Sequence, residues 1–222
     1  MVSFTEVIAK AEQRLGKSNL NERLPKVKSA KELMAMPDDR YLSLMCLRIF
    51  RAGLKHSMVD TKWPTFEDVF LGFVPRRVRM MSDEGLEACL GNKQLIRHWG
   101  KLKSVRENAI AMVDLIDSGP GGMGSYLANW PGDQIVELWF ELAKRFNQMG
   151  GNSGPYFLRM TGKDTFMLTP HVIKALAEWG VYSGSGKGKG EQRKVQIVLN
   201  DWATESDLPL AHISMILAQT VD

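Results

Sequence analysis

The feature that most constrains the fold is a glycine-rich turn, 149–155, between two segments with helical periodicity. Gly150 and Gly151 end the first helix, because glycine adopts the left-handed conformation after a helix without a steric penalty. Gly154 and Pro155 begin the second helix, since proline is pre-set for a first helical turn. The apolar face of the first helix is formed by Ile135, Leu138, Trp139, Leu142 and Phe146. The stretch therefore predicts a helix, a tight hairpin and a second helix.

The turn also offers backbone N–H groups at the point where a helix begins. Such groups, together with the helix dipole, make a binding site for an anion or a phosphate without any side-chain charge. A nucleic-acid backbone would suit this site. The alternative is a helix corner whose glycines serve only a steric purpose. On the first interpretation the DNA-binding residues are Gly150, Gly151, Asn152, Ser153, Gly154 and Lys163.

Composition sets wide bounds on function. The pI near 9.0 comes from a formal charge of only +4, which permits a polyanionic partner without requiring one. Cys46 and Cys89 lie in apolar helical contexts rather than at metal-ligand or disulfide spacing, so they indicate a reducing compartment. The chain shows neither a membrane-spanning run nor a signal peptide. We expect a cytoplasmic monomer without cofactor or metal.

The rest of the chain reads as helices, so the fold class is all-α. Ser3 begins a first helix that ends at Gly16, and 17–28 is expected to be a polar connector. Another helix is expected to begin at Trp63, and the Gly/Lys-rich segment 183–190 to be a flexible, solvated loop. The glycines of 119–124 have the spacing of a dinucleotide fingerprint, but that motif requires a preceding strand and is dismissed. We expect one domain over 1–222, with residues 1–36 as an N-terminal extension.

Two parts of the sequence resemble a known class of DNA-repair enzyme. The segment 162–167 resembles the acidic turn that follows the hairpin in helix-hairpin-helix DNA glycosylases, and it contains Asp164. The middle of the chain, over roughly 41–115, resembles the core of the bacterial 3-methyladenine DNA glycosylase I family. The matching segments are 41–54, 66–75 and 96–109.

The resemblance implies an all-α glycosylase fold with helices in two lobes around a central cleft. It also implies double-stranded DNA as the partner, and hydrolytic removal of an alkylated, 3-methyladenine-type base in base-excision repair. Leu54, after Gly53, would wedge into the duplex as the base is flipped out. In the wider helix-hairpin-helix superfamily, the members that also cut the strand carry a Schiff-base lysine at the position of Tyr156, so the resemblance implies a monofunctional enzyme.

The sequence also departs from this family. Arg48 stands where the family has a base-reading glutamate, and His56 where it has a stacking tryptophan. The family's aromatic N-terminal motif has no counterpart, and its zinc-binding positions correspond to Thr165 and Thr169, so zinc is not expected. Arg48 and His56 are candidate base-pocket residues. The alternatives are that Arg48 pairs with a carboxylate such as Glu67 or extends to solvent, and that His56 is a turn residue.

Asp164 is the candidate catalytic residue. An alkylated base already carries positive charge and leaves readily, so one carboxylate that stabilises the positive sugar is enough. The alternative role for Asp164 is to cap the helical turn at Thr165. A rival to the enzyme as a whole is a DNA-binding protein that uses the same hairpin but lacks the chemistry.

Overall fold

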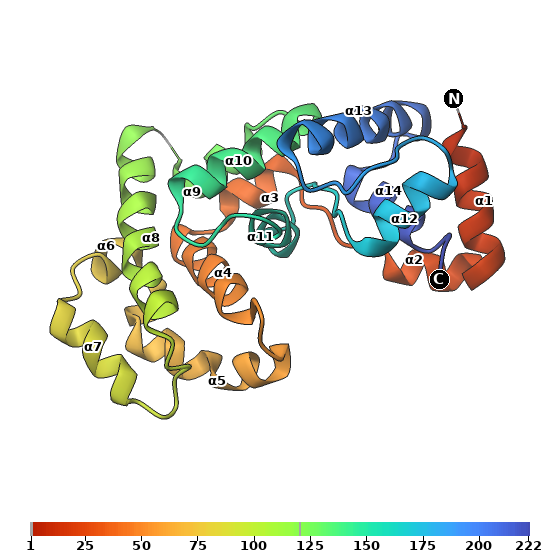
Figure 1. The fold of residues 1–222 in the computed structure, drawn as a ribbon. Helices are drawn as coiled ribbons and strands as arrows, with labels where there is room; N and C mark the ends of the chain where they lie inside the picture. Colours follow the sequence, from red (N-terminus) through yellow and green to blue (C-terminus); the bar gives the residue numbers. More distant parts are fainter. Residues whose placement is uncertain (1, 120) are drawn as a thin grey trace. The chain divides into compact units, whose positions relative to one another are not determined.

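A computed structural model describes residues 2–119 and 121–222, and the all-α prediction is confirmed: this part of the chain contains helices and no strand (Figure 1). The α-helices are α1 (Phe4–Leu15), α2 (Lys17–Arg23), α3 (Ala30–Ala35), α4 (Asp38–Arg51), α5 (His56–Val69), α6 (Pro75–Val78), α7 (Asp83–Gly91), α8 (Trp99–Ser118), α9 (Gly122–Ala128), α10 (Ile135–Arg145), α11 (Ser153–Thr161), α12 (Pro170–Glu178), α13 (Lys189–Ser206) and α14 (Leu210–Ala218). Two short 3-10 helices are η1 (Leu71–Phe73) and η2 (Gly132–Gln134).

The contacts divide the chain into two compact units. Unit 1 comprises Met1–Lys28, Trp130–Trp139 and Gly162–Asp222, and unit 2 comprises Ser29–Asn129 and Phe140–Thr161. The single-domain expectation stays a prediction. The expected N-terminal extension is divided, because its first 28 residues belong to unit 1.

In unit 1 the N-terminal helix packs against the two C-terminal helices. Phe4 and Trp202 are both fully buried, and their ring centroids lie 5.2 Å apart. As predicted, Ser3 caps α1 and Gly16 follows its last residue with a positive φ of 80°. The predicted connector 17–28 is wrong over its first half, because 17–23 forms α2. Leu20 is buried there, and one buried apolar side chain is enough to hold this short, otherwise polar helix in place.

Unit 2 is organised around α4, which contacts α5, α8, α9 and α11. Helix α4 begins directly after Pro37, its N-cap, and is buried along most of its length. Five rings, from Phe50, Trp63, Phe66, Phe70 and Phe73, form a continuous aromatic cluster beside it. The expected helix start at Trp63 is wrong: α5 already begins at His56, and Pro64 lies inside it. Pro64 has no backbone N–H and so removes one hydrogen bond from α5. On either side of it, Trp63 stacks on Phe66 with ring centroids 4.9 Å apart, and this contact stabilises the helix there.

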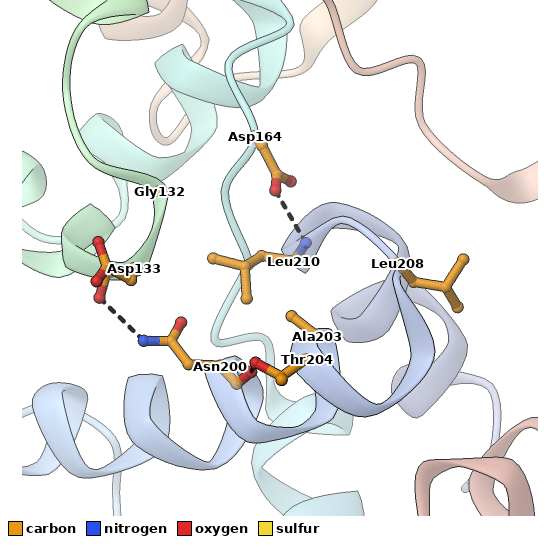
Figure 2. Close-up of a pocket in the computed structure, with 8 residues that line it drawn as sticks. All are labelled: Gly132, Asp133, Asp164, Asn200, Ala203, Thr204, Leu208 and Leu210. Atoms are coloured by element: carbon orange, nitrogen blue, oxygen red, sulfur yellow. Dashed lines mark hydrogen bonds between the residues drawn. The ribbon is translucent and has the colours of Figure 1, made fainter.

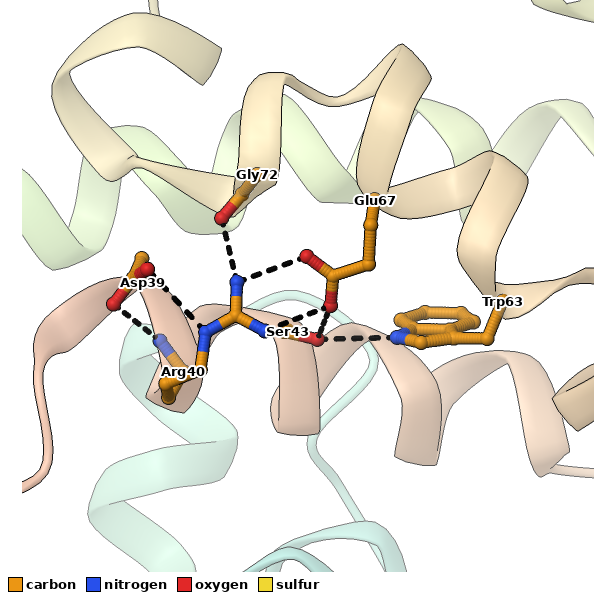
Figure 3. A network of polar contacts seen from close by, with 6 residues as sticks. All are labelled: Asp39, Arg40, Ser43, Trp63, Glu67 and Gly72. Atoms are coloured by element: carbon orange, nitrogen blue, oxygen red, sulfur yellow. Dashed lines mark hydrogen bonds and ion pairs between the residues drawn. The ribbon is translucent and has the colours of Figure 1, made fainter.

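A polar network fixes the start of α4 to α5 and η1 (Figure 3). The Arg40 guanidinium donates to both oxygens of Glu67, at 3.0 and 2.9 Å, and to the carbonyl oxygen of Gly72 at 2.8 Å. Ser43 Oγ donates to Glu67 Oε1 at 2.6 Å and accepts from Trp63 Nε1 at 3.1 Å. Because both oxygens of Glu67 already accept hydrogen bonds from Arg40 or Ser43, we assign this carboxylate a structural role.

The predicted hairpin is present between α10 and α11. Helix α10 ends at Arg145, several residues before the predicted glycines, and Gln148 takes a left-handed φ of 60°. Gly151 also has a positive φ, 56°, as expected of the residue that turns the chain. Helix α11 begins at Ser153, which places Pro155 in its first turn.

Candidate nucleic-acid interface and catalytic residues

The tip of the hairpin presents backbone amides next to the start of α11. Gly150, Gly151 and Asn152 are exposed, whereas Ser153 and Gly154 are buried, and Ser153 N donates to Gly150 O at 3.1 Å. Within residues 2–119 and 121–222, the amides of Gly151, Asn152 and Gly154 donate to no acceptor. These amides stand at the N-terminus of a nine-residue helix, where the dipole favours negative charge. The geometry can therefore bind an oxyanion.

Side chains of unit 2 hold the hairpin against α8. Asn108 is buried, and its amide group pairs with the backbone of Asn147: Oδ1 accepts from N at 2.6 Å, and Nδ2 donates to O at 3.1 Å. Gln148 Nε2 donates to Gly100 O at 2.8 Å. The hairpin is thus fixed at two points on one helix, which lowers the entropy that it would lose on binding a ligand.

The basic residues expected near the hairpin differ in their positions. Lys144 and Arg145 are exposed on the last turn of α10, where Arg145 faces Glu141 at 3.7 Å. Lys163, in contrast, is only 8% exposed, and its Nζ donates to Trp130 O at 2.8 Å inside unit 1. Burial lowers the pKa of this lysine. Its role as a DNA-binding residue stays a prediction, and the proposal below does not depend on it.

Arg48 lies on α4, and within residues 2–119 and 121–222 it has no partner of opposite charge. The expected pairing with Glu67 is wrong, because Arg40 holds that carboxylate. The Arg48 guanidinium instead lies 4.5 Å from the centroid of the Tyr156 ring, and its buried Nε has no hydrogen-bond partner. Desolvation lowers the pKa of Arg48. Tyr156, on the first turn of α11, had been considered only as the replacement of a lysine, and nothing in the sequence spacing connects it with Arg48.

The 52–56 loop follows α4 and is tied to the start of α8. Lys101 is buried, and its Nζ donates to Ala52 O at 2.6 Å and to Phe50 O at 3.3 Å. Gly53 is exposed with a φ of 74°, and Leu54 is half-buried. His56 is exposed as the first residue of α5. Unit 2 therefore combines the hairpin, Arg48 and this loop on one scaffold.

Asp164 belongs to unit 1, where it caps a helix distant in sequence (Figure 2). Its Oδ2 accepts from Leu210 N at 3.0 Å and its Oδ1 from Ala211 N at 2.8 Å, the first two amides of α14. The expected alternative, a cap on the turn at Thr165, has the right function but the wrong helix. A cavity of about 210 Å³ lies beside it, lined by Gly132, Asp133, Asp164, Asn200, Ala203, Thr204, Leu208 and Leu210.

The two threonines at the family's zinc positions have structural roles. Thr165 Oγ1 accepts from Trp139 Nε1 at 3.0 Å, and Thr169 Oγ1 accepts from Val172 N at the start of α12. A hydroxyl pair engaged in this way does not fit a zinc centre. Among residues 2–119 and 121–222, no three His, Cys, Asp or Glu side chains gather as a metal-ligand cluster. In the same part of the chain, no helix is both long and apolar enough to span a membrane.

Comparison with known proteins agrees with this geometry. The model of a family described as methyladenine glycosylase matches residues 33–149, just over half of the chain. A DNA-3-methyladenine glycosylase of Haemophilus influenzae is 34% identical over 67 residues, which are 30% of this chain. The aligned part spans only about a third of that relative, 36% of its length.

Solved structures share the fold. A variant of 3-methyladenine DNA glycosylase I in complex with 3-methyladenine has a TM-score of 0.54 at 17% identity, covering 69% of this chain and 89% of that one. The 3-methyladenine DNA glycosylase I of Staphylococcus aureus has a TM-score of 0.51 at 19% identity, covering 69% of this chain and 91% of its own. Together with the family match over residues 33–149, these comparisons identify the chain as a member of the methyladenine glycosylase family.

Proposed function

We propose that the protein is a monofunctional DNA glycosylase that removes an alkylated, 3-methyladenine-type base from double-stranded DNA in base-excision repair. Its membership of the methyladenine glycosylase family supports this proposal. The observation that carries it is the pair of exposed amides at Gly151 and Asn152, which have no acceptor among the residues that the structure describes and would suit a DNA phosphate. Its buried, unpaired cysteines are compatible with action in the cytoplasm. We expect it to act as a monomer without a cofactor.

In the proposed reaction the bond between C1′ and the base nitrogen breaks, and its electron pair leaves with the base. A water oxygen forms the new bond to C1′ and releases a proton. The hairpin would hold the backbone, Leu54 would fill the space left by the base, and Arg48, Tyr156 and His56 would face the flipped base. Phosphate contacts carry no sequence information, so binding should be independent of sequence and weaken with salt.

Asp164 is proposed to stabilise the positive charge that develops on the sugar. Each oxygen accepts one backbone amide of α14, which leaves lone pairs on both for another interaction. The cap also holds the carboxylate in a fixed position, as electrostatic catalysis requires. A structural role and a catalytic role for Asp164 are therefore compatible.

The decisive experiment measures base release from alkylated duplex DNA by wild type and by Asp164→Asn. Loss of a preorganised charge should lower the rate by roughly 10²-fold. However, asparagine replaces one of the two accepting oxygens with a donor, so it also weakens the α14 cap. The double variant Asp164→Asn/Pro209→Asp addresses this, because an aspartate at the N-cap position of α14 restores a capping carboxylate without restoring charge at 164.

The outcomes separate the proposed roles. If the double variant regains the wild-type melting temperature but not the rate, Asp164 acts in the chemistry. If it regains both, Asp164 is only a cap. Wild-type protein that binds duplex DNA but releases no alkylated base would support the rival, a DNA-binding protein without the chemistry.

A further inference from the structure

Six tryptophans occur in the chain, and one of them differs from the other five. Each of the five donates its Nε1 proton to an acceptor within the protein. Trp99 makes no such bond, and its ring contacts no other ring, among all the residues that the structure describes. Its side chain is 40% exposed. An indole needs a partner for its N–H when it is used in packing, so this one is not part of the core.

Trp99 lies close in sequence to residues that contact both the hairpin and the 52–56 loop. It is the first residue of α8, and its neighbours Arg97, His98 and Gly100 are exposed as well. The next residue, Gly100, accepts a hydrogen bond from Gln148 of the hairpin. Two residues on, Lys101 donates to the carbonyl of Ala52, beside Gly53 and Leu54. Trp99 therefore stands on the segment that joins the hairpin to the 52–56 loop, all within unit 2.

We propose that Trp99 is a stacking platform for an unstacked base of the DNA, which rests on the proposed function. Bending a duplex and removing one base from its stack exposes the faces of neighbouring bases. An exposed aromatic ring binds such a face without regard to sequence. The free indole N–H adds a donor for a base or phosphate oxygen, and the exposed Arg97 beside it favours a polyanion.

The test compares the affinity of wild type and Trp99→Ala for two duplexes of the same sequence. One is fully paired, and the other carries a tetrahydrofuran abasic analogue that interrupts the stack. We expect Trp99→Ala to weaken binding to the abasic duplex about tenfold, the effect of losing one base–aromatic stack, and to change binding to the paired duplex much less. Trp99→Phe should retain most of the affinity. The effect should persist as salt is raised, unlike the loss of a phosphate contact.

A matched control is available on the same helix. Ile110 is 42% exposed and lies eleven residues further along α8, about 16 Å away along the axis. Ile110→Ala should leave both affinities unchanged. Thermal melting of each variant checks that the fold is intact. Equal affinities of wild type and Trp99→Ala for the abasic duplex would overturn the proposal while leaving the glycosylase function in place. A wild-type protein that binds neither duplex would overturn both.

Discussion

Helices α11 and α14 both begin with a row of backbone amides, but only one of these rows is filled by the protein itself. At α14, Asp164 accepts from Leu210 N and Ala211 N. At α11, the amides of Gly151, Asn152 and Gly154 donate to nothing within residues 2–119 and 121–222. The N-terminus of a helix attracts negative charge in either case. The difference is that α14 has an internal carboxylate, whereas α11 is left open for an external anion.

Carboxylates of the protein also accept backbone amides at other helix starts. Glu205 accepts from Phe4 N at the start of α1, and Asp38 accepts from Met123 N in the first turn of α9. Glu191 accepts from Ser185 N and Gly188 N before α13. Helices α4 and α5 also begin without a side-chain cap, so an open helix start is not unique to α11. At α11, DNA phosphate is the anion that the proposed function supplies.

The largest expected effect comes from closing α11. Asn152→Asp keeps a good capping residue but places a carboxylate at the open amides. A unit charge about 4 Å from a phosphate is worth up to ~4 kcal/mol at an effective dielectric near 20. We therefore expect DNA affinity to fall on the order of a hundredfold, measured by fluorescence anisotropy at low salt. Asn152→Ser, which caps without charge, is the control. Unchanged binding by Asn152→Asp would remove the hairpin from the interface.

The converse change opens α14. Asp164→Ala removes both acceptors and leaves two amides unpaired, so we expect a loss of about 2 kcal/mol in the free energy of unfolding. Urea denaturation followed by circular dichroism measures it. Asp164→Asn, which retains one acceptor, should lose roughly half as much by the same principle. An alanine variant as stable as wild type would show that water replaces the cap without cost.

Arg48, whose guanidinium lies on Tyr156 of α11, is a second group whose polar atoms are not all hydrogen-bonded within the described residues. Its substitution tests whether it also binds the DNA. Its unpaired guanidinium would repel a cationic base, so Arg48→Met, which preserves length and packing on Tyr156, should bind alkylated cationic bases severalfold more tightly. Stability should stay within about 1 kcal/mol of wild type, because the change removes a partly desolvated charge that has no partner. The affinity for duplex DNA that carries an N-alkylated, cationic purine, compared by fluorescence anisotropy between wild type and Arg48→Met, measures the first effect. Weaker binding would assign Arg48 a direct role in holding the base.

The smallest effect concerns the closed row of amides before α13. Hydrogen bonds from Gly188 N and from Ser185 lower the pKa of Glu191 to about 2. A depressed carboxyl pKa stabilises the fold above the unfolded value near 4.3 and loses that contribution as the pH falls towards 2. The protection factors of the Ser185 and Gly188 amides, which correct for the pH dependence of intrinsic exchange, should therefore be high at neutral pH and fall as the pH drops from about 4 towards 2. Glu191→Gln should lower these protection factors already at pH 7, with the core of unit 1 unaffected.

Local signals in the sequence predicted much of this fold. The cap at Ser3 and the end of α1 at Gly16 depend on residues within one helix, and these predictions were confirmed. Arg40, rather than the expected Arg48, pairs with Glu67. The sequence could not predict this, because the pairing depends on which face of α4 contacts α5. Segment 183–190 was expected to be flexible, yet Glu191 orders it through contacts that its composition does not reveal.

For the candidate site, the sequence suggested residues but did not show the environment of each side chain. The hairpin glycines follow from backbone conformation, which glycine and proline encode locally. The cap that Asp164 provides joins residues 46 positions apart, and no periodicity indicates such a pair. Trp99 was noticed only as part of a matching segment, because a sequence does not show which tryptophan lacks a hydrogen-bond partner.

The two cysteines have a practical consequence for studying the parts of the molecule separately. Both are free thiols buried in unit 2, and unit 1 has none. Burial in the apolar interior of α4 raises the pKa of Cys46 far above that of an exposed thiol, so the native protein should hardly react with a thiol reagent. Labelling then requires opening of unit 2. The labelling rate at Cys46 thus reports the stability of the unit that carries the hairpin, in the full-length protein and with DNA present, while unit 1 remains silent.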